Sequence, residues 1–118
     1  MISFNLAEKG YEVDVRATEI GNDTLVIIYG GDRPHIGSVV LAYGFKKSSS
    51  KGTITSTTVP GHKEEELIRE PAEIIARHTE GTVVVVGGVH YEELDKEGID
   101  IICDLGIRAA ERIIDSSL

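Results

Sequence analysis

The sequence has 118 residues, of which 41% are hydrophobic and 5% aromatic, enough apolar content to close one two-layer core. We therefore expect a single domain over residues 1–118. Twelve Lys and Arg oppose twenty Asp and Glu, and the resulting net charge of −8 disfavours nucleic acids and anionic membrane surfaces as partners. A small anion can still bind where a few basic side chains and backbone N–H groups converge.

The first half of the chain is predicted to form five β-strands. They are residues 2–6, 11–17, 25–29, 38–44 and 53–59. The first two alternate polar and apolar side chains around a turn, which is typical of an antiparallel hairpin with one wet face. The third is a continuous apolar run, as in a strand buried on both faces. Residues 45–52 carry lysines and serines and are predicted to form a mobile loop.

The second half is predicted to form a helix, a strand and a second helix. From Lys63 onward apolar residues recur at helical spacing; we expect Pro71 to kink this helix or begin its second segment, and Gly81 to end it. Residues 82–86 contain four valines next to glycine, which is typical of a central strand. Residues 94–113 repeat apolar positions every three or four residues, which predicts a C-terminal helix that covers one sheet face.

These elements predict an α+β fold. We expect a two-layer sandwich, with the helices packed on one face of a mostly antiparallel sheet of about six strands. Sequential hairpins would leave the other sheet face polar. The edges of such a sheet and the long C-terminal helix offer surfaces for self-association, so a homodimer or larger homo-oligomer is expected.

The start of the chain and its cysteine favour a cytoplasmic location. Residues 1–10 lack a basic segment followed by an apolar stretch, and no apolar run approaches the ~20 residues that span a bilayer. The lone Cys103 cannot form an internal disulfide. It lies in an apolar helical run, where we expect a buried and inert thiol.

Three short segments pair glycine with histidine where a predicted strand ends. They are Gly-Gly-Asp-Arg-Pro-His-Ile-Gly at 30–37, Val-Pro-Gly-His-Lys at 59–63 and Gly-Gly-Val-His-Tyr at 87–91. A helix start exposes unpaired N–H groups, glycine lets a ligand approach the backbone, and histidine can donate to a phosphate oxygen. The segments therefore predict an anion site. The candidate residues are Gly31, Arg33, His35, Gly37, Gly61, His62, Lys63, Gly87, Gly88, His90 and Tyr91, with Arg33 offering a bidentate fork.

Plainer roles stay open for the same segments. Glycine-rich turns are ordinary connectors between strands and helices. Asp32 can simply fix its turn, and His62 and His90 can be residues that happen to lie near helix N-termini. His78 precedes Gly81 near the predicted end of a helix, where the helix dipole explains it.

A metal site is the alternative use of three histidines. His35, His62 and His90 are well separated in the sequence and no second cysteine accompanies them, so the spacing is not that of a structural zinc site. Three histidines with an open position do occur in catalytic zinc centres, which keeps a metal-assisted hydrolase or decarboxylase as an alternative. No serine stands in a Gly-x-Ser-x-Gly elbow, and neither Gly-x-Gly-x-x-Gly nor a lysine-bearing nucleotide loop occurs.

The three glycine–histidine segments, in this order, resemble the LpdD-like prenylated-flavin chaperone family, whose members are encoded beside UbiD-type decarboxylases. The resemblance covers nearly the whole chain. It implies a fold similar to that of proteasome assembly chaperones. It also implies a non-catalytic carrier that binds reduced prenylated FMN and delivers it to a UbiD-type decarboxylase, with a flavin prenyltransferase as a further candidate partner. Some members carry the older label of decarboxylase.

The implied ligand has one phosphate for the glycine–histidine segments and a large, partly apolar ring system. The aromatic residues available to pack on the ring are Tyr29, Tyr43, Phe45 and Tyr91, with core packing as the alternative for Tyr29. The loop at 46–51 is expected to close over the ligand. A third hypothesis remains, a pure assembly or interaction module in which the glycine segments are scaffolding.

Overall fold

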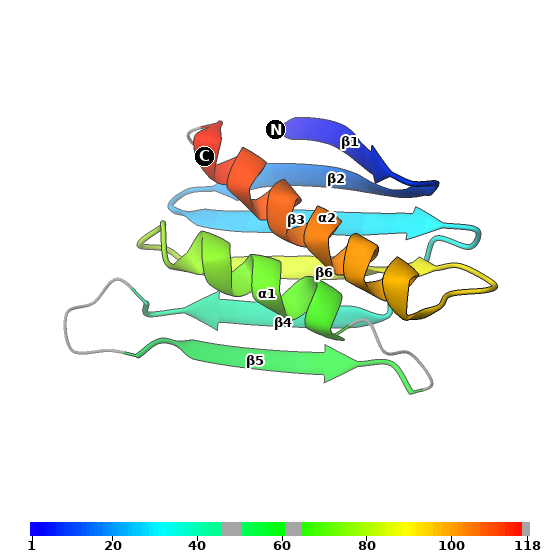
Figure 1. Ribbon diagram of the computed structural model, residues 1–118. Coiled ribbons are helices and arrows are strands. Elements are labelled where there is room, and N and C mark those ends of the chain that lie inside the picture. The colour runs from blue at the N-terminus through cyan, green and yellow to red at the C-terminus, as the bar shows by residue number, and fades with distance from the viewer. Residues whose placement is uncertain (46–50, 61–64, 117–118) are drawn as a thin grey trace.

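The computed structural model describes residues 1–45, 51–60 and 65–116 (Figure 1). These residues form β1 (Ile2–Glu8), β2 (Tyr11–Ile20), β3 (Asp23–Gly31), β4 (Ser38–Tyr43), β5 (Thr53–Thr58), α1 (Glu65–Ala76), β6 (Val83–His90) and α2 (Lys96–Asp115). The elements follow one another in the predicted order. Both helices lie on the same face of the sheet, as Figure 1 shows, so the prediction of an α+β two-layer sandwich is confirmed.

The six strands form one sheet in the order β1-β2-β3-β6-β4-β5. Neighbouring strands are antiparallel except for β3 and β6, which run parallel. Because β3 and β6 are parallel, they end side by side, with Gly31 paired to His90. Strand β4 starts at this same end and β5 finishes there, since Ser38 pairs with Gly87 and with Thr58. We call this end of the sheet the His90 end.

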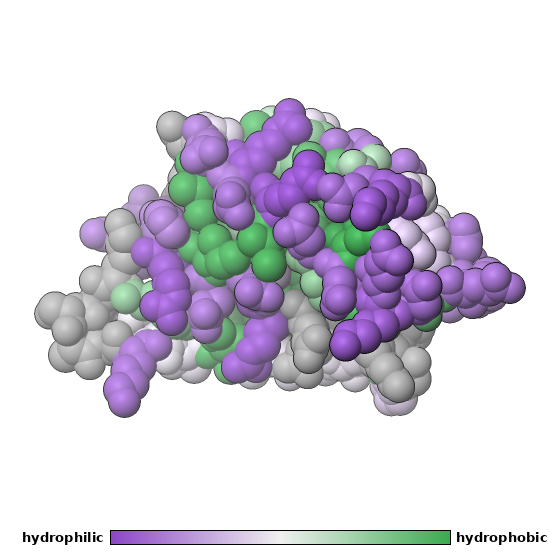
Figure 2. Space-filling view, in the orientation of Figure 1, coloured by the Kyte–Doolittle hydropathy of each residue, from purple (hydrophilic) through white to green (hydrophobic). Residues whose placement is uncertain are grey.

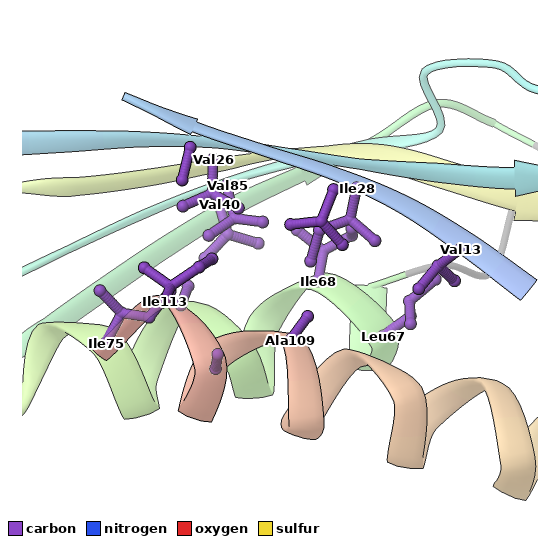
Figure 3. Close-up of a cluster of buried hydrophobic side chains, with 14 of the residues drawn as sticks. Val13, Val26, Ile28, Val40, Leu67, Ile68, Ile75, Val85, Ala109 and Ile113 are labelled. Atoms are coloured by element: carbon purple, nitrogen blue, oxygen red, sulfur yellow. The ribbon is translucent and has the colours of Figure 1, made fainter. Parts of the chain in front are cut away.

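The core lies between the sheet and the two helices (Figure 3). Successive residues of a strand point to opposite faces, so alternate residues of each strand point toward the helices. From the sheet, Val13, Val26, Ile28, Val40 and Val85 meet Leu67, Ile68 and Ile75 of α1 and Ala109 and Ile113 of α2. All of these side chains are buried. Apolar alternation therefore fixes which sheet face the helices cover.

Helix α1 is shorter than predicted. It passes through Pro71 and ends at Ala76, well before the expected stop at Gly81. His78 lies just beyond this end, and its Nδ1 donates to the carbonyl oxygen of Ile74 at 2.9 Å. The contact satisfies a carbonyl of the last helical turn, which is the helix-end role considered for this histidine.

The second face of the sheet differs from the prediction. It was expected to be polar, but its middle is apolar. We call these side chains the apolar strip: Leu25, Ile27 and Tyr29 of β3, Val84 and Val86 of β6, and Val39, Leu41 and Tyr43 of β4. They are half-buried or exposed, because the helices cover the other face. Polar side chains lie on the flanking strands, on β2 and β1 to one side and on β5 to the other.

Cys103 also differs from the prediction, because it is half-buried rather than buried. It lies on the side of α2 that meets the polar side chains of α1, and it lines a groove of about 460 Å³ with Arg69, Glu70, Glu73, Ile99 and Asp100. Figure 2 shows that hydrophilic residues dominate this helix side of the molecule. Within the described residues, neither helix has the combination of length and apolar character that crossing a membrane requires.

Candidate functional site

The ends of β3 and β6 bring two of the three glycine–histidine segments together. The backbone N–H of Asp32 donates to the carbonyl oxygen of His90 at 2.7 Å, which continues the parallel ladder by one bond. The Asp32 carboxylate in turn accepts from the backbone N–H of Glu92 at 3.0 Å. Asp32 therefore fixes the chain beyond β3 against the chain beyond β6, in keeping with the plain structural role considered for it.

Four side chains gather at this junction, and we call them the histidine cluster: Arg33, His35, His90 and Glu92. Arg33 Nη2 donates to His90 Nε2 at 3.0 Å. Because a guanidinium group has no acceptor, Nε2 is the unprotonated nitrogen of His90 in this contact. His35 Nδ1 donates to the backbone carbonyl oxygen of Arg33 at 3.0 Å, and the His35 and His90 rings meet edge to face with centroids 6.3 Å apart.

A carboxylate completes the cluster. Glu92 Oε1 lies 3.3 Å from Arg33 Nη2 and 3.6 Å from His90 Nε2. The side chains of Arg33 and Glu92 are 70% and 64% exposed, so water screens this ion pair and it contributes little to stability. The Glu92 carboxylate thus lies beside Arg33 where an external anion would bind. Because the ion pair is weak, such an anion could displace the carboxylate.

Glycine is required at two positions beside the cluster, because neighbouring atoms leave little room for a Cβ there. A Cβ on Gly31, whose φ is +90°, would lie 2.1 Å from the carbonyl oxygen of His90. A Cβ on Gly88 would lie 3.0 Å from both Nε2 and the backbone oxygen of His35. Glycine at position 88 therefore leaves room for the His35 ring over the sheet.

The segment at 87–91 is not the turn into a helix that the sequence suggested. Gly87 and Gly88 continue the strand pairing with β3, and β6 extends to His90. Helix α2 begins only at Lys96, where the Asp95 carboxylate accepts from the N–H of Gly98 at 2.8 Å. The helix start predicted directly after His90 is therefore wrong, and His90 lies instead at a strand end beside Arg33.

Gly37 connects the His90 end to the remaining glycine–histidine segment, residues 59–63. Its N–H donates to the carbonyl oxygen of Gly87 at 2.9 Å, and its carbonyl oxygen accepts from the N–H of Val59 at 2.8 Å. The 59–63 segment therefore starts at the same end of the sheet as the histidine cluster. Gly61, His62 and Lys63 lie outside the described residues, so their part in the site stays a prediction, as does the closing loop at 46–51.

The predicted aromatic residues separate into different regions. Tyr29 pairs with Gly88 on one side and Asp14 on the other, so it lies next to the histidine cluster on the face away from the helices and not in the core. It borders a hollow of about 270 Å³ with Ser3, Phe4, Asp14, Val15 and Arg16. Tyr43, paired with Thr53, and Phe45 beyond it lie at the opposite end of the sheet.

Tyr91 lies on the helix side, away from the cluster. Its hydroxyl accepts from the backbone N–H of Glu12 at 2.8 Å and lies 3.3 Å from the Glu12 carbonyl oxygen, to which it donates. Its ring meets the edge of Tyr11 with centroids 5.0 Å apart. These contacts tie the chain after β6 to the start of β2, which explains the residue without a ligand.

Substitution Tyr91→Phe is expected to lower the free energy of unfolding by about 1–2 kcal/mol, because it removes both hydrogen bonds to Glu12 and retains the ring. Urea denaturation measures the change. Tyr43→Phe is the matched control, since Tyr43 is 42% exposed on a strand far from this contact. Equal effects of the two substitutions would contradict the role assigned to the Tyr91 hydroxyl.

Within residues 1–45, 51–60 and 65–116, no group of three His, Cys, Asp or Glu side chains is placed so that it could hold a metal ion. His35 and His90 lie together, but the third histidine of the metal alternative, His62, is outside these ranges. The three-histidine metal site therefore stays a prediction.

Sequence comparison gives a match along almost the whole chain. The family model for the prenylated flavin chaperone LpdD-like domain matches residues 7–117. The chain belongs to this LpdD-like chaperone family. The resemblance expected from the three segments is thus confirmed, and the family supports a chaperone role for this protein.

One curated protein and one solved structure are similar to this LpdD-like chaperone. Protein LpdD of Lactiplantibacillus plantarum (strain ATCC BAA-793 / NCIMB 8826 / WCFS1) is 27% identical over 110 residues, covering 84% of this chain and 72% of that protein. A chain from the crystal structure of a novel chaperone complex for yeast 20S proteasome assembly is 12% identical, with a TM-score of 0.62, and the match covers 98% of this chain and 94% of that one. At such low identity the structural likeness shows a shared fold alone.

Proposed function

We propose that this LpdD-like chaperone binds reduced prenylated FMN at the histidine cluster and delivers it to a UbiD-type decarboxylase, without catalysing a reaction itself. The observation that carries the proposal is the convergence of Arg33, His35 and His90 from two distant segments at the His90 end. Family membership supports the chaperone role and suggests a protein partner.

The cluster suits a phosphate. Arg33 presents a planar fork of donors, and charge-assisted bonds from such a fork to phosphate are short and strong. His35 and His90 flank it, with their ring centroids 6.3 Å apart. The local positive charge of Arg33 offsets the repulsion that a chain with a net charge of −8 exerts on an anion at long range.

The neighbouring sheet surface suits the ring system. Tyr29 is paired directly to Gly88, over which His35 lies, and it borders the hollow that also contains Arg16. A flat ring laid on Tyr29 would gain aromatic and apolar contact while its phosphate stays at the cluster. By contrast, the groove between the helices is lined by three carboxylates and one arginine, a charge balance that disfavours an anion.

Phosphate dependence of binding tests this assignment. In anaerobic titrations followed by flavin absorbance and fluorescence, reduced prenylated FMN is expected to bind. Unmodified FMN and riboflavin then isolate the phosphate. Riboflavin, which lacks the phosphate, is expected to bind at least ~30-fold more weakly than FMN, the equivalent of about 2 kcal/mol for the lost charge-assisted bonds. Tight binding of riboflavin that does not depend on the phosphate would overturn the proposal.

Glu92→Gln is expected to strengthen the binding of the phosphate-bearing ligand about 5- to 10-fold and to slow its release. The Glu92 carboxylate lies 3.3 Å from Arg33 Nη2 and competes with the phosphate there, whereas a neutral amide competes less. Equilibrium titration and stopped-flow dissociation measure the two effects.

Glu97→Gln is the matched control. Glu97 is also exposed and its carboxylate pairs with Lys9 at 3.8 Å, so the substitution changes the net charge equally without touching the cluster. A similar gain in both variants would mean that overall charge, and not competition at Arg33, sets the affinity.

A further inference from the structure

The face of the sheet opposite the helices carries the apolar strip without a cover from the described part of the chain. Strands lie about 4.8 Å apart and same-face side chains about 6.8 Å apart along a strand, so the strip on β3, β6 and β4 measures roughly 14 Å by 20 Å. With the flanking rows of β2 and β5 the face projects to roughly 500 Å², and more when side-chain relief is included. A standard protein interface buries about 800 Å² on each partner.

The pattern on this face matches the anatomy of an interface. Val39 and Tyr43 are 40% and 42% exposed despite their apolar character. The β5 side of the strip carries the uncharged row Thr53, Thr55 and Thr57. An apolar centre with polar margins, on a patch of several hundred Å², marks a contact surface in soluble proteins.

The distribution of charge over the molecule favours the apolar strip as the surface on which two copies of the chain meet. Two copies of a chain with net charge −8 repel one another, so a contact surface with few acidic groups is the one that adds least to this repulsion. The outward side of α2 carries Glu97, Asp100, Asp104 and Glu111, whereas the apolar strip and the threonine row carry no charge. On β2, Glu12, Asp14 and Arg16 lie on this face, so a two-fold contact can set the arginine of one copy against a carboxylate of the other.

We infer that a second copy of this chain packs against the apolar strip, with the two sheets face to face and the helices outside. Two sheets stacked about 10 Å apart bury their inner side chains as in a β-sandwich. The strip then becomes the centre of a homodimer core. The hollow beside Tyr29 lies at the margin of this contact, so the second copy would cover it from the solvent side.

The molar mass of the purified full chain in solution tests the inference. Sedimentation equilibrium is expected to give a dimer of the 12.8 kDa chain. Val39→Glu and Tyr43→Glu are each expected to weaken the dimer at least ~100-fold, because each buries an unpaired carboxylate within the contact. Both positions are exposed in the single chain, so circular dichroism should show that each variant folds.

Ile99→Glu is the matched control, because Ile99 is an isolated apolar residue on α2 that is 45% exposed. It should leave the dimer intact. A wild-type chain that remains monomeric at every concentration overturns the inference, as does a dimer that dissociates with Ile99→Glu and not with Val39→Glu. A monomer whose strip variants lose only a decarboxylase partner would assign the face to that partner instead. Arg33→Ala should remain dimeric, so failure of ligand binding and failure of dimerisation are separable.

Discussion

Replacing Arg33 with alanine is expected to weaken the binding of reduced prenylated FMN by about 30- to 150-fold, the equivalent of about 2–3 kcal/mol. The guanidinium supplies the strongest phosphate donors of the cluster, and its Nη2 also holds His90 Nε2 at 3.0 Å. Its removal leaves the Glu92 carboxylate unpaired beside the phosphate. Anaerobic titration measures the dissociation constant of each variant.

Two further arginine variants isolate the contact. Arg108→Ala removes the same charge at a distant exposed pair, where Arg108 Nη1 lies 3.8 Å from Glu8 Oε1, and should change affinity less than about twofold. Arg33→Lys keeps the charge and loses the fork, so an intermediate loss is expected. If Arg33→Ala and Arg108→Ala weaken binding equally, the phosphate does not bind at Arg33.

Gly87→Ala is expected to lower the free energy of unfolding by about 3 kcal/mol or more. Gly87 has a φ of +156° in the central strand β6, and a Cβ there would lie 1.6 Å from the carbonyl oxygen of Ile28. The parallel pair of β3 and β6 would have to separate at the point that supports the histidine cluster. Urea denaturation followed by circular dichroism measures the loss.

Gly10→Ala separates steric overlap from backbone strain. Gly10 has a φ of +88°, but no atom lies within 4 Å of the position that a Cβ would take, so only the strain of about 1 kcal/mol is expected. If the two substitutions cost the same, the close approach of β6 to β3 is not what requires glycine at position 87.

Much of the fold was predictable because each strand and helix has its own periodicity. The exception at β6 is instructive. Glycine was expected to end the valine strand, but glycine inside a strand also marks close backbone approach, and the apolar Val89 that follows keeps the alternation of Val83 and Val85. That alternation is the signal by which the longer strand could have been found.

The candidate site was only partly predictable. Arg33, His35 and His90 were singled out by residue type and by their position after strands, but their contact depends on the parallel pairing of β3 and β6. Local sequence does not specify this pairing, because it joins segments almost sixty residues apart, such as Arg33 and His90. Glu92 was missed for the same reason: no local pattern places its carboxylate beside Arg33.

The face opposite the helices was predicted incorrectly although its signal was present. Residues 25–29 and 83–86 are apolar at every position, which indicates burial on both faces. The apolar composition of these two central strands is a stronger indication than the general expectation that one face of an antiparallel sheet is polar and exposed to solvent. They fit a sheet whose second face is covered by another molecule.

The central claim is that the chain carries prenylated FMN, and capture of the ligand in the cell tests it most directly. The protein is co-expressed with a flavin prenyltransferase and purified anaerobically, and the bound material is identified by absorbance and mass spectrometry. Wild-type protein should retain reduced prenylated FMN, and His90→Ala should lose it. A wild-type protein that emerges without flavin, or that holds a metal ion in its place, would contradict the account.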